Sequence, residues 1–262
     1  DRDVTGVQTC ALPIFHRHNY FFILVVKKGS GKHVIDLVPY PISDRTVFML
    51  RPGQIHQLQM NPDCTGFLLQ FDAAFYTPGD TRSKQRFRRA SAKNYCVPGP
   101  EQFERIHAVL STISAEYAAK QADYMELIRL NLEIFFIEFL RQSQGLEINP
   151  DAESAYAYER LEEFQELLEQ HVAAHLPVGN YAEMLGISVY QLNKMTRNLI
   201  GKTVSEAIND QLVLESKRQL LGTSAQVKDV AYSLGFEDVS YFSRFFKKHT
   251  GSSPETFRND FR

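Results

Sequence analysis

Short apolar runs alternate with turn residues over the first part of the chain. Residues 20–26, 33–37, 47–50 and 67–71 are rich in β-branched and aromatic side chains. Glycine and proline separate these runs, and Gly29-Ser30-Gly31 is the first clear turn. Runs of this length between such turns are typical of strands. Regularly spaced short strands predict a β-barrel or a β-sandwich.

From Glu101 to Gln144 the apolar period becomes that of a helix. One seam has the spacing 3, 4, 3, 4 and consists of Phe103, Ile106, Leu110, Ile113 and Tyr117. This heptad pattern predicts dimerisation, with packing inside one chain as the alternative. A second predicted helix, 124–142, has a similar seam of Leu127, Leu130, Ile134 and Ile137. Because three phenylalanines make it apolar on more than one face, we expect it to be largely buried.

The last third of the chain contains an internal repeat of roughly fifty residues. Each copy has an alanine, a leucine and a glycine followed by an apolar pair: Ala182, Leu185, Gly186, Leu192 and Met195, then Ala231, Leu234, Gly235, Phe242 and Phe245. In a helix-turn-helix, the crossing of the helices needs a small residue, and the turn needs a positive φ that glycine adopts cheaply. The repeat therefore predicts two such motifs.

A helix predicted over 203–221 joins the two copies of the repeat. At this length it spans roughly 28 Å. Successive major-groove faces on one side of B-DNA are ~34 Å apart. One connecting helix is therefore long enough to hold two DNA-reading helices on the same side of a duplex.

Charge changes this picture through its position and not through its total. The formal net charge is −2, which excludes bulk electrostatics as the means of binding DNA. However, residues 185–205 and 239–254 contain no acid and carry several basic side chains. The three cysteines form no framework, and no apolar run is long enough to span a bilayer, so we expect a cytoplasmic protein.

The run 229–258 reads DVAYSLGFEDVSYFSRFFKKHTGSSPETFR and resembles the signature of the AraC/XylS family of transcription regulators. The resemblance covers about 158–261 and implies a seven-helix DNA-binding domain with two helix-turn-helix motifs. Pro254 is expected to begin its last helix. Asp238 is expected to cap the second recognition helix.

Exposed positions near the start of a recognition helix reach base edges. We predict DNA contacts there from Val189, Tyr190, Asn193, Lys194, Ser240, Tyr241, Ser243 and Arg244. The residue types suggest that Arg244 forms bidentate hydrogen bonds to guanine and that Asn193 pairs with adenine. Phosphate contacts are assigned to Arg197, Lys202, Lys247 and Lys248.

The segments His16-Arg17-His18 and 51–56 (RPGQIH) resemble the two half-motifs of a cupin, the usual sensor barrel of AraC-type proteins. His16, His18 and His56 are therefore candidate ligand-binding residues. Lys28 is a further candidate, because it lies just before the Gly29 turn, where some sugar-sensing relatives have a cation. Three imidazoles are also a possible metal set, which leaves a metal-dependent cupin enzyme as an alternative. Phe22, however, stands where metal-binding cupins have a glutamate, so we predict no metal and no cofactor.

The expected organisation is α+β and multidomain. Residues 4–14 resemble the translation of a short-read sequencing adapter, so 1–14 are expected to be an artefact and the barrel to be truncated at its start. The expected parts are a cupin-like sensor barrel (15–99), a helical dimerisation region (100–144), a linker (145–157) and an all-α double helix-turn-helix domain (158–262). The basic segment 82–93 is interpreted as a solvated connection.

No Ser/His/Asp arrangement, phosphate loop or carboxylate pair indicates catalysis. We therefore predict a sequence-specific transcription regulator and not an enzyme. Its expected partners are double-stranded DNA, a small-molecule effector, RNA polymerase and a second copy of the chain. The alternative within this class is a barrel that serves only as a dimerisation scaffold.

Overall fold

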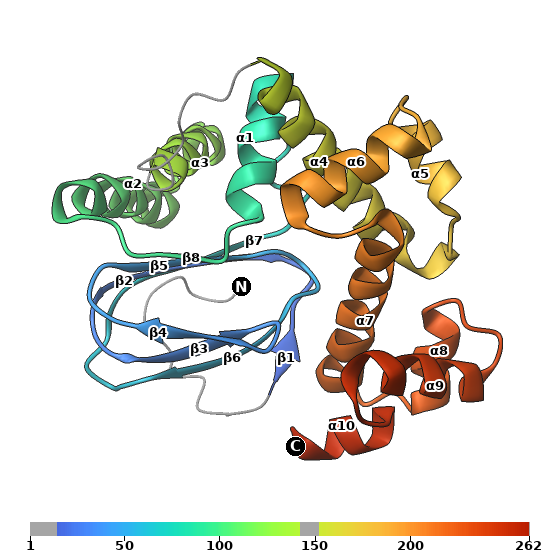
Figure 1. The fold of residues 1–262 in the computed structure, drawn as a ribbon. Helices are drawn as coiled ribbons and strands as arrows, with labels where there is room; N and C mark the ends of the chain where they lie inside the picture. The colour runs from blue at the N-terminus through green and yellow to red at the C-terminus, as the bar shows by residue number, and fades with distance from the viewer. Residues whose placement is uncertain (1–14, 142–151, 262) are drawn as a thin grey trace. The chain divides into compact units, whose positions relative to one another are not determined.

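The computed structural model describes residues 15–141 and 152–261 (Figure 1). The chain divides into two compact units, Asp1–Glu147 and Ile148–Arg262. The predicted adapter segment and the first part of the predicted linker lie outside the described residues. A helix already begins at Ala152, so the last part of that linker is helical. None of the helices described is long and apolar enough to cross a membrane.

The first unit contains two four-stranded antiparallel sheets. Sheet A has the order β1-β6-β3-β4, and sheet B has the order β7-β2-β5-β8. The strands of sheet A are β1 (His16–Arg17), β6 (Ile55–Met60), β3 (Gly31–Ile35) and β4 (Val38–Ile42). Those of sheet B are β7 (Thr65–Phe71), β2 (Phe21–Lys28), β5 (Thr46–Leu50) and β8 (Tyr95–Cys96).

Strand β2 is apolar on both faces because both faces of sheet B are covered. Phe22, Leu24 and Val26 contribute to a core that includes side chains of both sheets. Phe21, Ile23 and Val25 point the other way and join a core with the helices of this unit. Successive side chains of a strand face opposite sides, so a strand buried on both sides has no polar alternation.

The four strands predicted from the sequence are confirmed, whereas β4, β6 and the two-residue strands β1 and β8 were missed. Strand β4 reads VPYPI, and prolines argue against a strand. It lies at the edge of sheet A, where a missing backbone N–H leaves no ladder bond broken. Strand β6 reads IHQLQM and has too many polar residues for the apolar pattern to indicate it.

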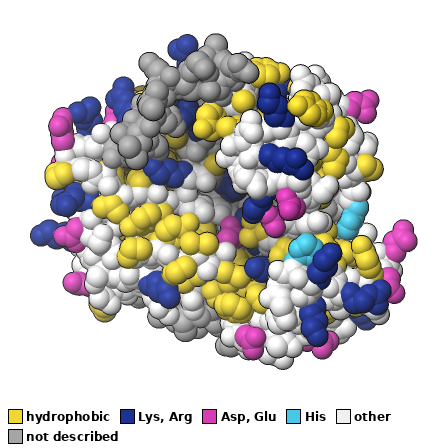
Figure 2. Space-filling model, viewed as in Figure 1, with side chains coloured by type: hydrophobic (Ala, Val, Ile, Leu, Met, Phe, Trp, Pro, Cys, Tyr) yellow, Lys and Arg dark blue, Asp and Glu magenta, His cyan; other side chains and the backbone are white. Residues whose placement is uncertain are grey.

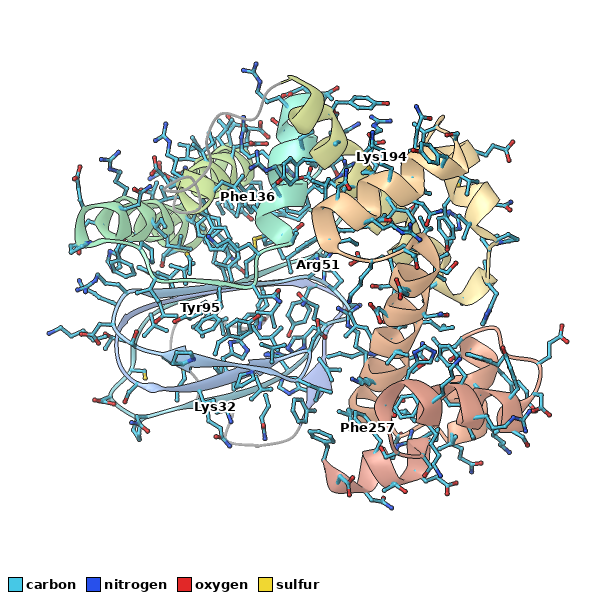
Figure 3. The ribbon with its side chains drawn as sticks, in the orientation of Figure 1. Lys32, Arg51, Tyr95, Phe136, Lys194 and Phe257 are labelled. Carbon is cyan, nitrogen blue, oxygen red and sulfur yellow. The ribbon has the colours of Figure 1, made fainter. Side chains whose placement is uncertain are left out.

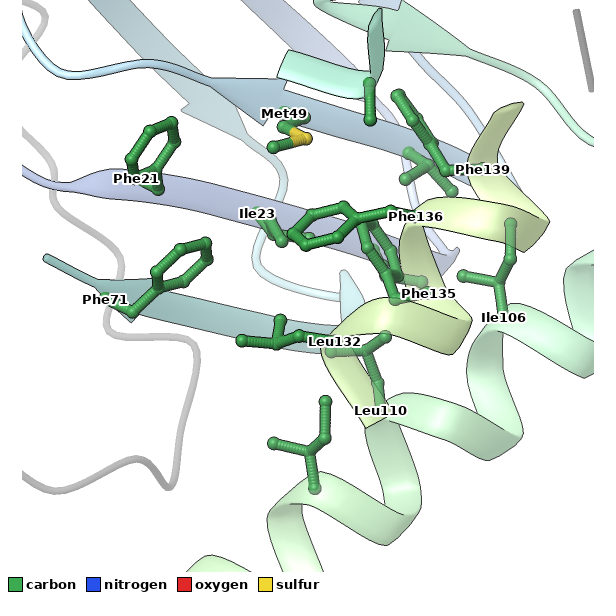
Figure 4. Packing of buried hydrophobic residues seen from close by; sticks show 14 of the residues in the cluster. Phe21, Ile23, Met49, Phe71, Ile106, Leu110, Leu132, Phe135, Phe136 and Phe139 are labelled. Carbon is green, nitrogen blue, oxygen red and sulfur yellow. The ribbon is translucent and has the colours of Figure 1, made fainter. Parts of the chain in front are cut away.

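Three helices cover the outer face of sheet B: α1 (Thr81–Ser91), α2 (Pro100–Ala119) and α3 (Tyr124–Arg141). Figure 4 shows Phe135, Phe136 and Phe139 of α3 pointing toward the sheet and toward Ile106 and Leu110 of α2. All five side chains are buried. This shared core fixes the helical pair onto the sheet.

The heptad seam of α2 faces this core. Phe103, Ile106, Leu110 and Ile113 are buried in their own chain, and Tyr117 packs at the edge of the cluster. The prediction of dimerisation through this seam is therefore wrong, because these side chains are already covered. Internal packing, the alternative that the spacing left open, is what the structure has.

The corresponding seam of α3 faces outward. Leu130 is 52% exposed and Ile134 is 45% exposed, although both belong to a helix expected to be largely buried. Leu127 is exposed as well, and Ile137 is half-buried. The phenylalanine face of α3 is the one that the fold covers, so its aliphatic seam remains at the surface.

The basic segment 82–93 is a helix and not a solvated connection. Phe87 of α1 packs against Phe136 with 5.0 Å between ring centres and the ring planes tilted by 60°, and Ala90 is fully buried. Arg86 forms a 2.6 Å ion pair with Glu133 of α3. Glu133 also accepts a hydrogen bond from the Tyr76 hydroxyl. This helix is therefore anchored to the core, with Arg82, Lys84 and Arg89 exposed and Arg86 and Arg88 half-buried.

The second unit is helical. Its elements are α4 (Ala152–His171), a 3-10 helix η2 (Val172–Ala174), α5 (Val178–Met184), α6 (Val189–Ile200), α7 (Val204–Gly222), α8 (Val227–Ser233), α9 (Val239–Thr250) and α10 (Pro254–Asp260). The pairs α5–α6 and α8–α9 are the two predicted helix-turn-helix motifs. Figure 1 shows them at the two ends of α7. The repeat and its connecting helix are therefore confirmed.

The residues that define the repeat have the predicted roles. Ala182 and Ala231 are buried, and Gly186 and Gly235 have φ of 65° and 79°. Gly235 is constrained further, because a Cβ there would lie 2.0 Å from the carbonyl oxygen of Ala173. Only glycine meets both conditions at this turn.

Each recognition helix begins at a cap and packs one apolar face. Ser188 forms a capping box with Gln191, and Asp238 caps α9 as predicted. Pro254 begins α10, also as predicted. The inward pair of α9 is Phe242 with Phe246, not with Phe245, which is half-buried. An i, i+4 pair lies closer to one line along a helix than the i, i+3 pair that we expected.

Candidate effector site and nucleic-acid interface

Histidines gather at one end of the space between the two sheets. Strand pairing places His16 directly opposite His56, and His18 follows two residues later. The ligand atoms of His16, His18 and His56 all lie within 4.8 Å of one another. The convergence expected from the two half-motifs is therefore present.

A fourth histidine extends this cluster. Nε2 of His33 lies 2.8 Å from Nδ1 of His56, and Nε2 of His56 lies 2.8 Å from Nε2 of His18. Each short contact needs one proton, which makes His33, His56 and His18 a hydrogen-bonded chain. Nδ1 of His33 is buried with no hydrogen-bond partner among the described residues. His33 was not among the residues predicted from the sequence, although it lies two positions from inward-facing Ile35.

The environment keeps these imidazoles uncharged. Burial, followed by the charge of His16, lowers the pKa of His33 to about 3. Burial and three neighbouring histidines lower the pKa of His56 to about 2. Burial and His16 lower the pKa of His18 to about 4. At neutral pH each ring is therefore both a donor and an acceptor.

Aromatic rings form the walls around the cluster. Tyr20 stacks on His18 with 4.4 Å between ring centres, and Phe22 meets His56 at 5.1 Å. Phe48 meets His33 at 4.7 Å. In Figure 3, Tyr95 lies between the two sheets, where it contacts Phe48 at 5.3 Å. Polar groups thus converge at one end of an otherwise apolar interior.

A hollow of about 580 Å³ opens at this end and is lined by Arg17, His18, Asn19, Tyr20, Pro52 and Gly53. His18 is therefore reachable from outside, while His33 and His56 lie deeper. A concave site with an apolar wall and a few convergent polar groups is the usual form of a small-molecule pocket.

The structure does not bring Lys28 to this site. Phe22 contacts the histidines, and Lys28 lies six residues further along the same strand, roughly 20 Å away. Lys28 is exposed and pairs with Thr65 of β7. The prediction that Lys28 shares a pocket with the histidines is therefore wrong, because an extended strand holds Phe22 and Lys28 at its two ends.

The recognition helices present most of the predicted DNA-contacting residues to solvent. Tyr190 is 77% exposed on α6, and Tyr241 is 56% exposed on α9. Val189, Lys194, Arg197, Ser240, Arg244, Lys247 and Lys248 are exposed as well. Figure 3 shows Lys194 on α6, and Figure 2 shows Lys and Arg side chains at the surface over α9. Ser243 is only half-buried and stays within reach of this face.

Asn193 differs from the prediction. Its side-chain amide donates to the carbonyl of Val189 at 3.1 Å, and its oxygen accepts from the backbone N–H of Val204 at 3.2 Å. Val204 is the first residue of α7, so Asn193 joins the recognition helix to the connecting helix. Both of its polar groups are occupied, and pairing with adenine would break these bonds.

Two further observations concern the cations. Lys202 forms a 2.6 Å ion pair with Asp210, so a phosphate contact would have to compete with this carboxylate. A second hollow, about 270 Å³, is lined by Asn209 of α7 and by Tyr241, Arg244, Phe245, Lys248 and His249 of α9. Asn209 and His249 were not predicted, because neither stands out until α7 and α9 are packed together.

The comparisons with known proteins assign both units. Residues 13–126 match the model of an AraC-like ligand binding domain. Residues 181–260 match the model of a helix-turn-helix domain. The first match contains both sheets, and the second contains both helix-turn-helix motifs apart from the first three residues of α5.

Several relatives match along almost the whole chain. The transcriptional activator RhaS of Enterobacter sp. (strain 638) is 26% identical over 259 residues, covering 93% of this chain and 86% of that protein. RhaS of Yersinia pestis bv. Antiqua (strain Angola) is 24% identical over 256 residues, covering 93% and 88%. A structure of ToxT from Vibrio cholerae covers 93% of this chain and 91% of its own, with 17% identity and a TM-score of 0.48.

These findings define a DNA-binding transcription regulator with an attached ligand-binding domain. The chain combines an AraC-like ligand-binding domain with a helix-turn-helix domain of the AraC type, and it is homologous to the RhaS activators of the AraC family.

Lowered histidine pKa values predict that stability falls in mild acid. The unfolded chain takes up protons near pH 6.5 at His33 and His56, which stay neutral in the fold until about pH 3 and about pH 2. Stability is therefore complete above pH 6.5 and decreases below it, by up to about 1.4 kcal/mol per pH unit for each histidine. Urea denaturation in the presence of a chelator measures the free energy of unfolding from pH 7.5 to pH 5. This pH range lies above the one in which carboxylates titrate.

His33→Gln should reduce the steepness of this loss, since one histidine no longer titrates. His249→Ala, at an exposed position in the other unit, should leave it unchanged. Identical slopes for the wild type and His33→Gln would show that His33 does not remain neutral in the fold.

Proposed function

We propose that this regulator reads DNA with α6 and α9, and that a small molecule bound at the histidine end of the first unit changes its DNA binding. The observation that supports the first part is the pair of capped, solvent-facing recognition helices on one connecting helix, α7. The relatives are activators, and we propose the same sign of regulation here. DNA as the target implies cytoplasmic action with RNA polymerase as a partner.

For base reading we favour Tyr190, Lys194, Tyr241 and Arg244. All four are exposed and stand on the first two turns of their helices, where the chain approaches base edges. Arg244 has the planar donor fork that matches guanine. Arg197, Lys247 and Lys248 stand further along and suit phosphates, which position the protein without reading sequence.

For the effector, the support is the polar cluster at the mouth of an apolar interior. A molecule entering the hollow would meet His18 and Tyr20 first, both able to donate and to accept hydrogen bonds. A ligand shifts DNA binding only if its affinity differs between two states of the chain. The relatives, which are transcription regulators, support a sensor and not an enzyme.

We also propose a homodimer, formed through the outward seam of α3. Leu127, Leu130, Ile134 and the half-buried Ile137 repeat at intervals of three and four along one helix face. Such a stripe left in water is costly, and pairing with the same stripe of a second copy buries it. The proposed dimer surface is therefore the seam of α3 and not that of α2, which is already buried.

The DNA assignment predicts different losses for two neighbouring cations. Arg244→Ala should weaken binding to the operator by about 1–3 kcal/mol and relax the preference at one base pair. Lys247→Ala should weaken binding to all sequences alike and reduce the salt dependence by about one counterion. Binding to operator and random DNA over a salt series measures both. Equal losses on both DNAs for Arg244→Ala would rule out base reading by this residue.

The effector assignment predicts selective stabilisation of the first unit. Hydroxylated and carboxylated compounds are screened by thermal shift, and a true effector at 100 times its Kd should add about 2.7 kcal/mol. His18→Ala should abolish this gain, whereas Lys28→Ala, at the far end of β2, should retain it. The DNA footprint of the protein should then differ between samples with and without the compound. Binding without any change in the footprint would support the scaffold alternative instead.

The dimer assignment predicts a change of mass. The wild type should run at twice the 30.0 kDa of one chain in light scattering. Ile134→Glu should give a folded monomer, because it places charge in the seam. Thr112→Glu, on the exposed side of α2, is the control and should remain dimeric. A dimeric Ile134→Glu protein would exclude this seam.

A further inference from the structure

The histidine cluster has the donor set and the geometry of a metal centre. We propose that His16, His18 and His56 bind one divalent transition-metal ion at the open end of the first unit. This proposal deepens the effector-binding function given above and rests on it. The three rings come from two paired strands, β1 with its extension and β6, and share one face of sheet A. Their donor atoms lie within 4.8 Å of one another, and each ring supplies one.

Phe22 in place of a glutamate does not exclude such a site. Three imidazoles with a vacant fourth position form a complete catalytic-type zinc site, so no carboxylate is required. Imidazole also suits Cu²⁺, Ni²⁺ and Fe²⁺, whereas Mg²⁺ and Ca²⁺ need oxygen ligands. The ring of Phe22 lies 5.1 Å from that of His56 and closes the apolar side. The chemistry therefore selects transition metals.

The distances need only small changes. Four ligands held at about 2.1 Å from a tetrahedral ion are about 3.4 Å apart. His18 and His56 are 2.8 Å apart at their Nε2 atoms, so their rings would separate by roughly half an ångström. His18 is half-buried at the end of its strand and has room to move. The ion would take the place of the proton that these two atoms now share.

Neighbouring groups support the bound form. Nδ1 of His56 faces His33 at 2.8 Å, so an ion on Nε2 of His56 would leave Nδ1–H to donate to His33. A hydrogen bond of this kind orients a metal-binding histidine. The hollow lined by Arg17, Asn19 and Tyr20 leaves the fourth position open to water or to a small anion.

The test is a titration of the full chain, without a histidine tag and after dialysis against chelator. Co²⁺ should bind once per chain and give the visible absorption bands of a low-coordinate nitrogen site, and Zn²⁺ should displace it. His16→Ala and His18→Ala should each weaken binding by more than about tenfold, since even outer groups contribute that much. Both side chains are only half-buried, and a thermal melt confirms that each variant is folded.

His249→Ala, which removes an exposed histidine of the other unit, is the matched control and should bind cobalt like the wild type. Absence of stoichiometric binding, or unchanged binding in folded His18→Ala, would overturn the metal site. The effector function is tested separately, because an organic compound that stabilises the wild type after chelation, and alters its footprint, succeeds without any metal. Loss of both responses would refute both proposals.

Discussion

The double-sided burial of sheet B is the constraint on which the first unit depends. Phe22 and Leu24 close the space between the sheets, while Phe21 and Ile23 on the same strand hold the helices. Strand β2 therefore joins the two cores, and the neighbouring strand β5 does the same through Met49 on one face and Phe48 on the other. The same alternation fixes the register, because a shift by one residue would exchange the two faces. Register in turn sets which side chains of the neighbouring strands face inward.

In the second unit the connecting helix α7 has the corresponding role. Asn193 ties its first residue to α6, and Leu220 near its end accepts a hydrogen bond from Arg258 of α10. The recognition helices α6 and α9 both pack against α7, and Gly235 allows the second turn to pack against η2. Basic side chains are left on the outside of these helices. A net charge of −2 is compatible with DNA binding because only these local faces approach the phosphates.

At the histidine end of the first unit, the same side chains contribute to packing and supply the chemistry of the site. Burial that would normally exclude polar groups is tolerated there because the imidazoles hydrogen-bond to one another. The same burial keeps their pKa values low. A group of neutral imidazoles at the mouth of an apolar interior suits either hydrogen bonding to a small molecule or binding of a metal ion. The two uses are compatible, since both take place at the open side of His18.

The sequence by itself determined the local elements, because each depends on residues close in the chain. The 3, 4 spacing predicts helices, short β-rich runs predict strands, and Gly186 and Gly235 predict the two turns. Only the tertiary structure decided which face of a helix is covered, since periodicity defines a face but not its partner. The seams of α2 and α3 look alike in sequence, yet Ile113 is buried and Ile134 is exposed. Likewise, strand pairing and not proximity in sequence brought His33 to His56 and left Lys28 at the far end.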